Sequence, residues 1–455
     1  MKNVTRYKNK KVLVLGLALS GFHAAKLLAK LGAYVTVNDS KKLNDNPDAQ
    51  ELIASGIRVI SGHHPVELLD EAFAFIIKNP GIPYNNPMVE KALELNMPIF
   101  TEVELAAEIL EASLVGITGT NGKTTTTAMV YDLLNTNRSK GKAYKAGNIG
   151  IPAAEVAQIA TEADDVVMEL SSFQLMGIDT LRPHIAIITN LSEAHLDYHG
   201  SRDEYVKAKW RLTENQTEAD YLILNWEQEE LRELSKQTKA QVIPFSQTEV
   251  VTNGAYVKDN QIYFQEEVVM PVASLRVPGQ HNLENALAAI AVAKLKGVSN
   301  ATIEEALMAF GGVTHRLQFV KEVAGRKFYN DSKSTNIVAA KTALTSFPNQ
   351  PIVLIAGGLD RGNEFDELIP ELKLVKALIV FGEAKDKLEK AAKKAGIKTI
   401  IHTENPATAV KDSLTISEAG DVVLLSPACA SWDQYKNFEL RGDHFVQAIK
   451  EIGEE

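Results

Sequence analysis

The sequence predicts an α/β protein of two or three domains. The length, 455 residues, exceeds what one hydrophobic core usually organises. Short apolar runs alternate along the chain with segments whose apolar residues recur at helical spacing. Two of the runs are followed directly by glycine-rich loops, at residues 16–21 and 119–122, and then by helical patterns. Strand, glycine loop and helix in that order are typical of nucleotide-binding sheets.

Composition narrows the function classes. The net charge of −10 gives no overall basic field to hold nucleic acid or an acidic membrane. The single cysteine, Cys429, excludes an intrachain disulfide framework, and we expect it to pack rather than to act as a nucleophile. Residues 1–11 do not resemble a signal peptide, and no run of about 18 apolar residues could span a bilayer. We expect a soluble, cytoplasmic protein.

The first hundred residues predict a Rossmann-like βαβ unit. A strand over 11–15 leads through the loop 16–21 to a helix over 22–31, and a strand over 34–38 ends at Asp39. Ala18 occupies the position of the middle glycine in the dinucleotide fingerprint, which disfavours a tightly held pyrophosphate. Asp39 either accepts a hydrogen bond from a ribose or base or has no binding role.

Two more parallel strands are expected over 57–61 and 73–77. The second runs into the turn 78–83, at a carboxyl end of the sheet, where open α/β sheets bind ligands. Proline and glycine also suffice to explain a sharp turn there.

The loop 117–125 is the strongest motif. It lies between a strand over 113–116 and a helix over 126–134, so its backbone N–H groups and the helix dipole would face an anion. Ile117 replaces the first glycine of the P-loop pattern, which makes residues 119–123 a shortened variant. We predict that the loop binds ATP, with Lys123 at the terminal phosphates and Thr124 on a bound Mg²⁺.

Polar residues follow the next strands of this domain. Glu169 ends a strand over 165–168 and would be a second support for Mg²⁺, and the turn 146–150 can expose Asn148. His195 follows a strand over 185–190, and structural and catalytic roles both remain open for it. Lys209 lies in an amphipathic helix over 205–212, where a solvated lysine is the default expectation.

The last third predicts a second Rossmann-like sheet. Asn282 and His281 precede an alanine-rich helix over 286–295, either as caps or as contacts to an adenine nucleotide. Strands are expected over 327–330, 352–355, 377–381 and 421–425, and the lysine-rich helix after residue 381 should be solvated. Asp331, Lys333, Arg361 and Ser431 follow strand ends, which suits an anionic substrate and a phosphate.

Five segments carry a resemblance to a known family: GTNGKTT (119–125), NLSEAHLD (190–197), HRLQFV (315–320), NDSKSTN (330–336) and SPACASWDQYKNFELRGDHF (426–445). The chain resembles the ATP-dependent amide ligases that build the peptide of bacterial peptidoglycan. The first two segments are shared across that family, and the last three are typical of its D-glutamate-adding member. The resemblance covers nearly the whole chain.

The resemblance implies three domains: a Rossmann-like uridine-nucleotide domain (1–101), a central P-loop-type ATPase with a mostly parallel sheet (102–312) and a C-terminal Rossmann-like amino-acid domain (313–455). It implies that D-glutamate is added to UDP-N-acetylmuramoyl-L-alanine through an acyl phosphate. The implied cofactors are ATP, two Mg²⁺ ions and a CO₂-derived carbamate on Lys209, which reverses the default expectation for that lysine. A monomer is expected.

The resemblance also implies site residues, which share strand ends and loops. The catalytic residues would be Lys123, His195, Lys209 and Lys333. ATP would contact Gly119, Thr120, Asn121, Gly122, Lys123, Thr124, Thr125, Asn282, Asn285, Arg316 and Asp331. The metals would be held by Thr124, Glu169, His195 and carbamylated Lys209. The UDP-muramoyl substrate would contact Leu19, Ser20, Asp39, Ser40, Asn79, Asn148 and Ser171. D-Glutamate would contact His195, Thr335, Arg361, Ser431 and, through its backbone, Phe438.

One segment departs from the family pattern, and three alternatives stay open. Some members have GGDGK where this chain has residues 357–362, so Arg361 would replace a lysine as partner of the D-glutamate side-chain carboxylate. A folylpolyglutamate synthase shares the loop chemistry, but its sequence around Asp331 differs. A regulatory P-loop protein would not need Lys209 or His195. An NAD-dependent dehydrogenase is disfavoured by Ala18.

Overall fold

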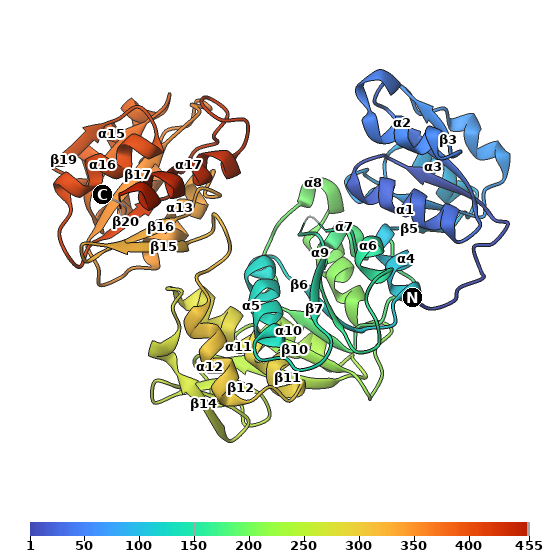
Figure 1. Ribbon diagram of the computed structural model, residues 1–455, viewed down its shortest axis with the longest axis horizontal. Coiled ribbons are helices and arrows are strands. Elements are labelled where there is room, and N and C mark those ends of the chain that lie inside the picture. The colour runs from blue at the N-terminus through green and yellow to red at the C-terminus, as the bar shows by residue number, and fades with distance from the viewer. Residues whose placement is uncertain (150, 453–455) are drawn as a thin grey trace. The chain divides into compact units, whose positions relative to one another are not determined.

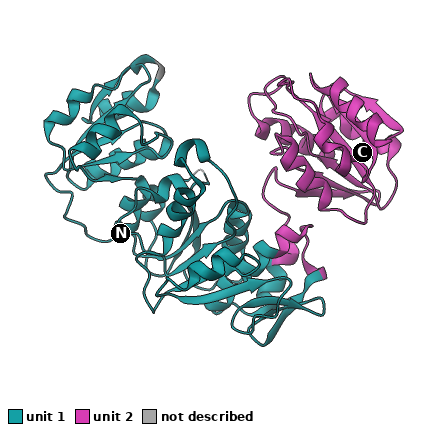
Figure 2. Cartoon of the chain, turned by 180° about the vertical axis from the view of Figure 1, so that it is seen from behind, with its two compact units in different colours: residues 1–272, 284–306 teal, residues 273–283, 307–455 magenta. Residues whose placement is uncertain are grey.

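The computed structural model describes residues 1–149 and 151–452. The chain forms two compact units, residues 1–272 with 284–306 and residues 273–283 with 307–455, coloured separately in Figure 2. The first unit contains a five-stranded and a nine-stranded sheet, and the second a six-stranded sheet. Figure 1 shows these sheets in blue, in cyan to yellow and in orange to red. The predicted α/β class with mostly parallel sheets is confirmed.

The five-stranded sheet is parallel in the order β3-β2-β1-β4-β5. Its strands are β1 (Lys11–Leu15), β2 (Tyr34–Asp39), β3 (Arg58–Ser61), β4 (Phe75–Lys78) and β5 (Ile99–Phe100). Its helices and 3₁₀ turns are α1 (Leu19–Lys30), η1 (Leu43–Asp45), α2 (Pro47–Ala54), η2 (Val66–Glu71) and α3 (Pro87–Glu94). Helix α1 begins three residues earlier than expected, because Ala18 is extended and serves as its N-cap.

The nine-stranded sheet has the order β14-β13-β12-β11-β10-β9-β6-β8-β7. Its strands are β6 (Ser113–Thr118), β7 (Ala143–Gly147), β8 (Asp165–Glu169), β9 (Ile185–Ile188), β10 (Tyr221–Asn225), β11 (Gln241–Ser246), β12 (Ala255–Lys258), β13 (Gln261–Phe264) and β14 (Glu267–Pro271). The neighbouring strands from β7 through β8, β6, β9, β10 and β11 to β12 pair in parallel, whereas β12–β13 and β13–β14 pair antiparallel. The sequence analysis did not predict this antiparallel edge.

The helices of this region carry the loops of interest. They are α4 (Glu102–Ile109), α5 (Lys123–Asn135), α6 (Ala153–Ala157), α7 (Ser172–Leu175), α8 (Leu196–His199), α9 (Arg202–Trp210), η3 (Arg211–Thr213), α10 (Glu229–Ser235), η4 (Val272–Ser274), α11 (Gln280–Leu295) and α12 (Asn300–Ala309). Helix α5 begins at Lys123 rather than at 126, so the lysine lies in its first turn. Helix α11 begins at Gln280, which places His281 and Asn282 inside the helix rather than before it. Gly150, the end of an expected turn, lies outside the described residues.

The six-stranded sheet has the order β15-β16-β20-β17-β18-β19 and is parallel except for the β15–β16 pair. Its strands are β15 (Gln318–Val323), β16 (Arg326–Asn330), β17 (Ile352–Gly357), β18 (Val375–Phe381), β19 (Thr399–His402) and β20 (Val422–Leu425). Its helices and 3₁₀ turns are α13 (Ile337–Thr345), η5 (Asp366–Leu368), α14 (Ile369–Leu372), α15 (Lys385–Ala395), α16 (Pro406–Ile416) and α17 (Phe438–Glu451). Two apolar clusters bury alternate residues of the same strands, for example Leu354 in one and Val353 in the other. Within a strand such alternation indicates that both sheet faces are covered.

Burial settles two smaller expectations. Cys429 is buried and desolvation raises the pKa of its thiol to about 12, in keeping with a packing role. Helix α15 buries only Leu388, Ala391 and Ala392, so its lysines are largely solvated as expected. Among the described residues, no helix combines the length and apolar character that crossing a bilayer requires.

Candidate active site

The glycine loop joins β6 to α5 by a backbone that requires glycine. Gly119 and Gly122 have φ values of +143° and +80°, in the region that other residues rarely adopt. A Cβ on Gly122 would lie 2.3 Å from Oδ1 of Asn285, and one on Gly119 would lie 1.9 Å from Oγ1 of Thr189. The loop is therefore packed closely from two sides. Its exposed edge presents the N-terminus of a helix of 13 residues, which favours an anion.

Lys123 folds back over the loop. Its Nζ donates hydrogen bonds to the carbonyl oxygens of Gly119 and Thr120, both at 2.9 Å. Asn285 reaches the same helix from α11, because Thr126 Oγ1 donates to Asn285 Oδ1 at 3.1 Å. The loop, Lys123 and Asn285, which the sequence analysis assigned to ATP, thus lie together.

Glu169 and Lys209 lie beside the loop. Glu169 ends β8, and the β6–β8 register pairs it with Ile117. Asn148 Nδ2 donates to Glu169 Oε1 at 2.8 Å, whereas Oε2 is buried without a hydrogen-bond partner in the described part of the chain. Lys209 Nζ donates to the Gly119 carbonyl at 2.7 Å and lies 4.7 Å from the Tyr205 ring centroid.

Lys209 is the residue for which the default expectation is wrong. It is 2% exposed rather than solvated. Burial, together with the Lys123 cation, lowers the pKa of Lys209 to about 6, while Glu169 opposes the shift. At neutral pH the amine is therefore largely uncharged.

His195 stands where the chain turns from the strand β9 toward α8. It is the N-cap residue of α8 and has a left-handed backbone with φ of +54°. A positive φ is uncommon for a residue other than glycine and marks stored strain. Its ring lies 5.0 Å from the Phe173 ring and 6.3 Å from the Tyr205 ring. Since the Tyr205 hydroxyl bonds Thr120 Oγ1 at 3.0 Å, this aromatic group adjoins the glycine loop.

His199, which was not predicted from the sequence, completes the same aromatic group. The ring stacks on Phe173 at 5.4 Å with an interplanar angle of 8°, and Nε2 bonds Ser172 Oγ at 2.9 Å. Burial and the nearby His195 and Lys209 lower the His199 pKa. The available signal was a second histidine only four residues after His195.

Ser171, assigned to the muramoyl substrate, has a clear local role. Its hydroxyl caps α7 and forms a capping box with Gln174.

The residues assigned to the uridine diphosphate gather at the carboxyl ends of β1, β2 and β4. Asp39 is 8% exposed and accepts hydrogen bonds from the backbone N–H groups of Leu17 and Lys41, at 2.6 and 2.8 Å. Asn79 Nδ2 donates to Ser20 Oγ at 3.1 Å. The side chains of Leu19 and Ser40 are exposed. Asp39 thus holds the glycine loop of this domain in shape.

Lys78, which precedes Asn79, was also missed. It is fully buried, and desolvation lowers its pKa to about 8. Its Nζ donates to the Ile82 carbonyl at 2.7 Å and to the Tyr198 hydroxyl at 3.2 Å. The turn after β4 is therefore tied to α8, next to His195.

The second unit gathers its own predicted residues at the carboxyl ends of β16, β17 and β20. Asp331 is buried, accepts from the Leu317 N–H and from Ser426 Oγ, and has its pKa raised to about 7 by desolvation. Lys333 Nζ lies 5.2 Å from the Phe438 ring centroid. Ser431 is buried, and Thr335 and Arg316 belong to the neighbouring loops. Asn282 Nδ2 donates to the Pro278 carbonyl at 2.6 Å.

Arg361 occupies the segment that departs from the family pattern. Its guanidinium lies 4.8 Å from the Trp432 ring centroid, and Trp432 is exposed. Neighbouring Asp360 instead pairs with Lys387 at 3.0 Å. An arginine stacked on an aromatic ring keeps its donor edge available to a carboxylate.

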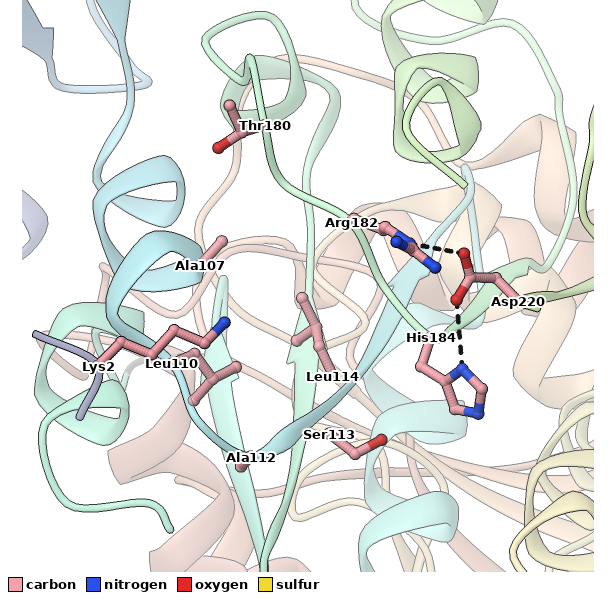
Figure 3. A pocket seen from close by; sticks show the side chains of 10 residues that line it. All are labelled: Lys2, Ala107, Leu110, Ala112, Ser113, Leu114, Thr180, Arg182, His184 and Asp220. Atoms are coloured by element: carbon pink, nitrogen blue, oxygen red, sulfur yellow. Dashed lines mark hydrogen bonds and ion pairs between the residues drawn. The ribbon is translucent and has the colours of Figure 1, made fainter. Parts of the chain in front are cut away.

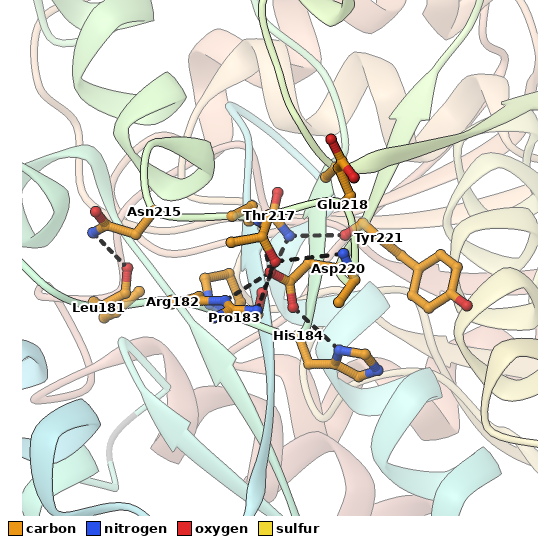
Figure 4. Close-up of polar contacts among 12 residues, drawn as sticks. Leu181, Arg182, Pro183, His184, Asn215, Thr217, Glu218, Asp220 and Tyr221 are labelled. Atoms are coloured by element: carbon orange, nitrogen blue, oxygen red, sulfur yellow. Dashed lines mark hydrogen bonds and ion pairs between the residues drawn. The ribbon is translucent and has the colours of Figure 1, made fainter.

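One pocket is unrelated to this chemistry. It has a volume of about 380 Å³, and its lining includes the polar residues Lys2, Ser113, Arg182, His184 and Asp220 (Figure 3). Ser113, His184 and Asp220 lie at the amino ends of β6, β9 and β10, whereas the glycine loop follows the carboxyl end of β6. Figure 4 shows why they are polar: Asp220 accepts from Arg182 at 2.7 Å and bonds His184 at 3.2 Å, which fixes the entry to two strands.

Three family models match successive parts of the chain, one for each sheet region. Residues 10–101 match the family model for the Mur ligase MurD-like N-terminal domain, residues 117–293 the Mur ligase middle domain, and residues 315–429 the Mur ligase glutamate ligase domain. Structures under 25% identical support the fold alone. A UDP-N-acetylmuramate–alanine ligase from Thermotoga maritima is 22% identical with a TM-score of 0.57, covering 98% of this chain and 100% of its own. A UDP-N-acetylmuramoyl-L-alanyl-D-glutamate–2,6-diaminopimelate ligase is 16% identical with a TM-score of 0.58, covering 98% and 93%.

Curated relatives are much closer. UDP-N-acetylmuramoylalanine–D-glutamate ligases from Enterococcus faecalis and Streptococcus pneumoniae are 62% and 57% identical. The first alignment covers 100% of this chain and 99% of the relative, and the second 100% of both. The same enzyme from Lactiplantibacillus plantarum is 58% identical over 99% of this chain and 98% of its own length. The resemblance to the D-glutamate-adding member is thereby confirmed, and the chain belongs to the Mur ligase family.

Proposed function

We propose that this protein is an ATP-dependent ligase that joins D-glutamate to UDP-N-acetylmuramoyl-L-alanine and releases ADP and phosphate, a step in peptidoglycan precursor synthesis. The observation that carries the proposal is the full-length identity of 57–62% to ligases named for this reaction. The glycine loop, Glu169 and Lys209 support it, because they assemble anion-binding and oxygen-donor groups in one place. From the family resemblance we also infer a monomer that acts in the cytoplasm.

The reaction has two steps. A carboxylate oxygen of the alanyl group attacks the γ-phosphorus of ATP, so that an acyl phosphate forms and ADP leaves. The amine nitrogen of D-glutamate then attacks the acyl carbon, loses a proton, and phosphate departs. In this proposal the loop 119–125 and Lys123 bind the phosphates, Asn282, Asn285, Arg316 and Asp331 contact the nucleotide, and Lys333 stabilises the charge of the transferring group.

The proposal assigns substrate contacts in each unit. Leu19, Ser20, Asp39, Ser40, Asn79, Asn148 and Ser171 would hold the UDP-muramoyl substrate. His195, Thr335, Arg361, Ser431 and the backbone of Phe438 would hold D-glutamate. Arg361 would take the side-chain carboxylate, because its planar fork suits bidentate recognition.

The residues around Glu169 fit Mg²⁺. The buried Oε2 of Glu169 has no partner among the described residues, and Thr124 offers a hydroxyl oxygen at the start of α5. Oxygen ligands of this kind are those that Mg²⁺ prefers. We propose Thr124, Glu169, His195 and carbamylated Lys209 as the groups that would hold up to two ions. When bound, Mg²⁺ would neutralise phosphate charge.

Lys209 fits the carbamate. Only an uncharged amine can bond CO₂, and the pKa of about 6 keeps Lys209 uncharged at neutral pH. The new bond joins Nζ to the carbon of CO₂, and one proton leaves the nitrogen. The product is an anionic oxygen ligand, which a protonated lysine cannot be.

The decisive test of the function is phosphate release with each substrate left out in turn. We expect turnover only when ATP, UDP-N-acetylmuramoyl-L-alanine and D-glutamate are all present. Turnover on a folate with glutamate would instead establish a folylpolyglutamate synthase. ATP hydrolysis that ignores both other substrates would indicate a regulatory ATPase.

Replacing Glu169 by glutamine tests the metal site. The amide keeps an oxygen for the Asn148 hydrogen bond but replaces the unpartnered Oε2 with a donor, so we expect the half-saturating Mg²⁺ concentration to rise about tenfold to a hundredfold. The measurement is a Mg²⁺ titration of ligase activity. Glu267→Gln is the matched control, because Glu267 is an exposed carboxylate of the same sheet paired with Lys294. An unchanged Mg²⁺ dependence of Glu169→Gln would rule out the assignment.

A further inference from the structure

Arg441, in the first turn of α17, is fully buried and has no ion-pair partner within the described residues. Its exposed fraction is 0%, and among the residues whose burial is described it is the largest side chain so completely enclosed. Burial lowers the pKa of Arg441 to about 10, so the guanidinium is still charged at neutral pH. A buried charge is costly unless hydrogen bonds compensate it, and an uncompensated one is rarely found in a fold.

The guanidinium holds three loops at once. Nε donates to Ser332 Oγ at 3.0 Å and Nη2 to the Ser332 carbonyl at 2.8 Å. Nη1 donates to the carbonyls of Cys429 at 3.0 Å and Gly357 at 3.4 Å. Ser332, Gly357 and Cys429 follow or end the adjacent strands β16, β17 and β20.

Each of these loops carries a residue assigned to the D-glutamate or acyl-phosphate region. Lys333 directly follows Ser332, Arg361 lies four residues after Gly357, and Ser431 lies two residues after Cys429. Ser332 Oγ also donates to the Phe438 carbonyl at 2.8 Å, which joins the fourth assigned residue to the same network. One guanidinium thus sets the mutual placement of four side chains or backbone groups.

The neighbourhood is built around an arginine. Gly358 has φ of +140°, and a Cβ there would lie 2.3 Å from the Ala430 carbonyl oxygen and 3.1 Å from Arg441 Nη1. Any other residue at 358 would separate two of the loops from the guanidinium. A lysine at 441 would offer three donors from one point, whereas the planar fork reaches acceptors in different directions.

We infer that Arg441 is a positioning residue for D-glutamate: by bonding the backbone of three strand-end loops it fixes Lys333, Arg361, Ser431 and Phe438 as one binding surface. This inference rests on the proposed function. It does not make Arg441 a catalytic residue, because the side chain is enclosed and acts through its neighbours.

The test compares Arg441→Lys and Arg441→Ala with the parent enzyme, measuring kcat and the KM of each substrate. We expect the KM for D-glutamate to rise at least about tenfold in Arg441→Lys, the usual effect of losing hydrogen bonds to a charged group. The KM for UDP-N-acetylmuramoyl-L-alanine should stay within about twofold, because its assigned contacts lie in residues 19–171 and not on these loops. Guanidinium ion added to Arg441→Ala should restore D-glutamate affinity in part.

Arg326→Lys is the matched control. Arg326 also donates to backbone and side-chain oxygens, those of Ser417, but at the opposite end of β16. Circular dichroism and Tm identify variants that fail to fold. If Arg441→Ala fails to fold, Arg441→Lys alone provides the test. The inference would be overturned if Arg441→Lys folded and kept the D-glutamate KM of the parent. It would also be overturned if the KM values of all substrates changed equally in Arg441→Lys, and by the same factor as in Arg326→Lys. If the parent enzyme itself shows no D-glutamate-dependent ADP release, the proposed function fails instead.

Discussion

Replacing Lys209 by alanine is expected to lower ligase turnover by about a hundredfold to a thousandfold, the range for loss of a group that stabilises developing charge. The physical reason is that the buried amine is uncharged near neutral pH and can become a carbamate, which alanine cannot. Acetate or another short carboxylate should restore part of the activity by supplying the missing oxygens. Turnover in CO₂-depleted buffer should fall for the parent enzyme and recover with bicarbonate.

Replacing Lys209 is expected to raise the stability of the fold, although it lowers turnover. The pKa of Lys209 is about 6 in the folded chain and near 10.4 for an unfolded lysine, so between these values the unfolded state binds more protons. Stability therefore rises with pH across this window, and at neutral pH the buried lysine destabilises the fold. In CO₂-free buffer at pH 7, Lys209→Met should have a higher Tm than the parent and a weaker rise with pH.

Lys207→Ala is the control for both measurements. Lys207 lies two residues away on α9, is exposed, and pairs with Glu204, so its removal should change neither turnover nor Tm appreciably. If Lys209→Ala turned over like the parent, or if acetate and bicarbonate had no effect on either protein, the carbamate assignment would be wrong.

Replacing Lys123 by alanine is expected to reduce ATP-dependent turnover by about a hundredfold to a thousandfold and to weaken nucleotide binding. Lys123 closes over the glycine loop through the Gly119 and Thr120 carbonyls, and a phosphate in the loop would meet that charge. Steady-state kinetics and calorimetric titration with ADP measure the two effects. Lys142→Ala, which removes an exposed lysine just before β7, should leave both unchanged.

The double variant Lys123→Ala/Lys209→Ala tests whether the two lysines are coupled. The Lys123 cation helps to lower the Lys209 pKa, so removing Lys123 should also raise that pKa and reduce carbamylation. The losses from Lys123→Ala and Lys209→Ala should therefore be clearly less than additive. Additive losses, or ADP affinity in Lys123→Ala equal to that of the parent, would contradict this placement of the two lysines.

Much of the fold was readable because its signals are local. The buried strands β1, β6, β8 and β17 are apolar runs followed by glycine or a polar strand end, and each formed close to the expected residues. The antiparallel strands β12 to β14 escaped because each is four or five residues long and half-polar. Helices α1, α5 and α11 begin earlier than the sequence pattern predicts, at Leu19, Lys123 and Gln280. The N-caps of the first two, Ala18 and Gly122, make no side-chain cap hydrogen bond and so leave little trace in the sequence.

In the candidate site, too, only the features that depend on local sequence could be predicted. The glycine loop can be recognised from the sequence, because its functional groups lie in consecutive residues. The burial of Lys209 and Lys78 cannot be predicted in this way, because it is set by contacts to residues far away in sequence, such as Gly119 and Tyr198. Helical periodicity on α9 placed Lys209 in solvent, and only the family resemblance reversed that expectation. Arg441 lies within one of the family motifs, but its role could be inferred only from its three carbonyl partners in the structure.

The left-handed backbone of His195 has a practical consequence for engineering. Design for thermal robustness would favour glycine or asparagine at this position, since either relaxes the main chain there. Such a choice would discard an imidazole that packs against Phe173 beside the nucleotide loop. If His195 has the role proposed above, ranking substitutions by folding energy alone would remove a functional side chain, so this position should be held fixed in any stabilised variant.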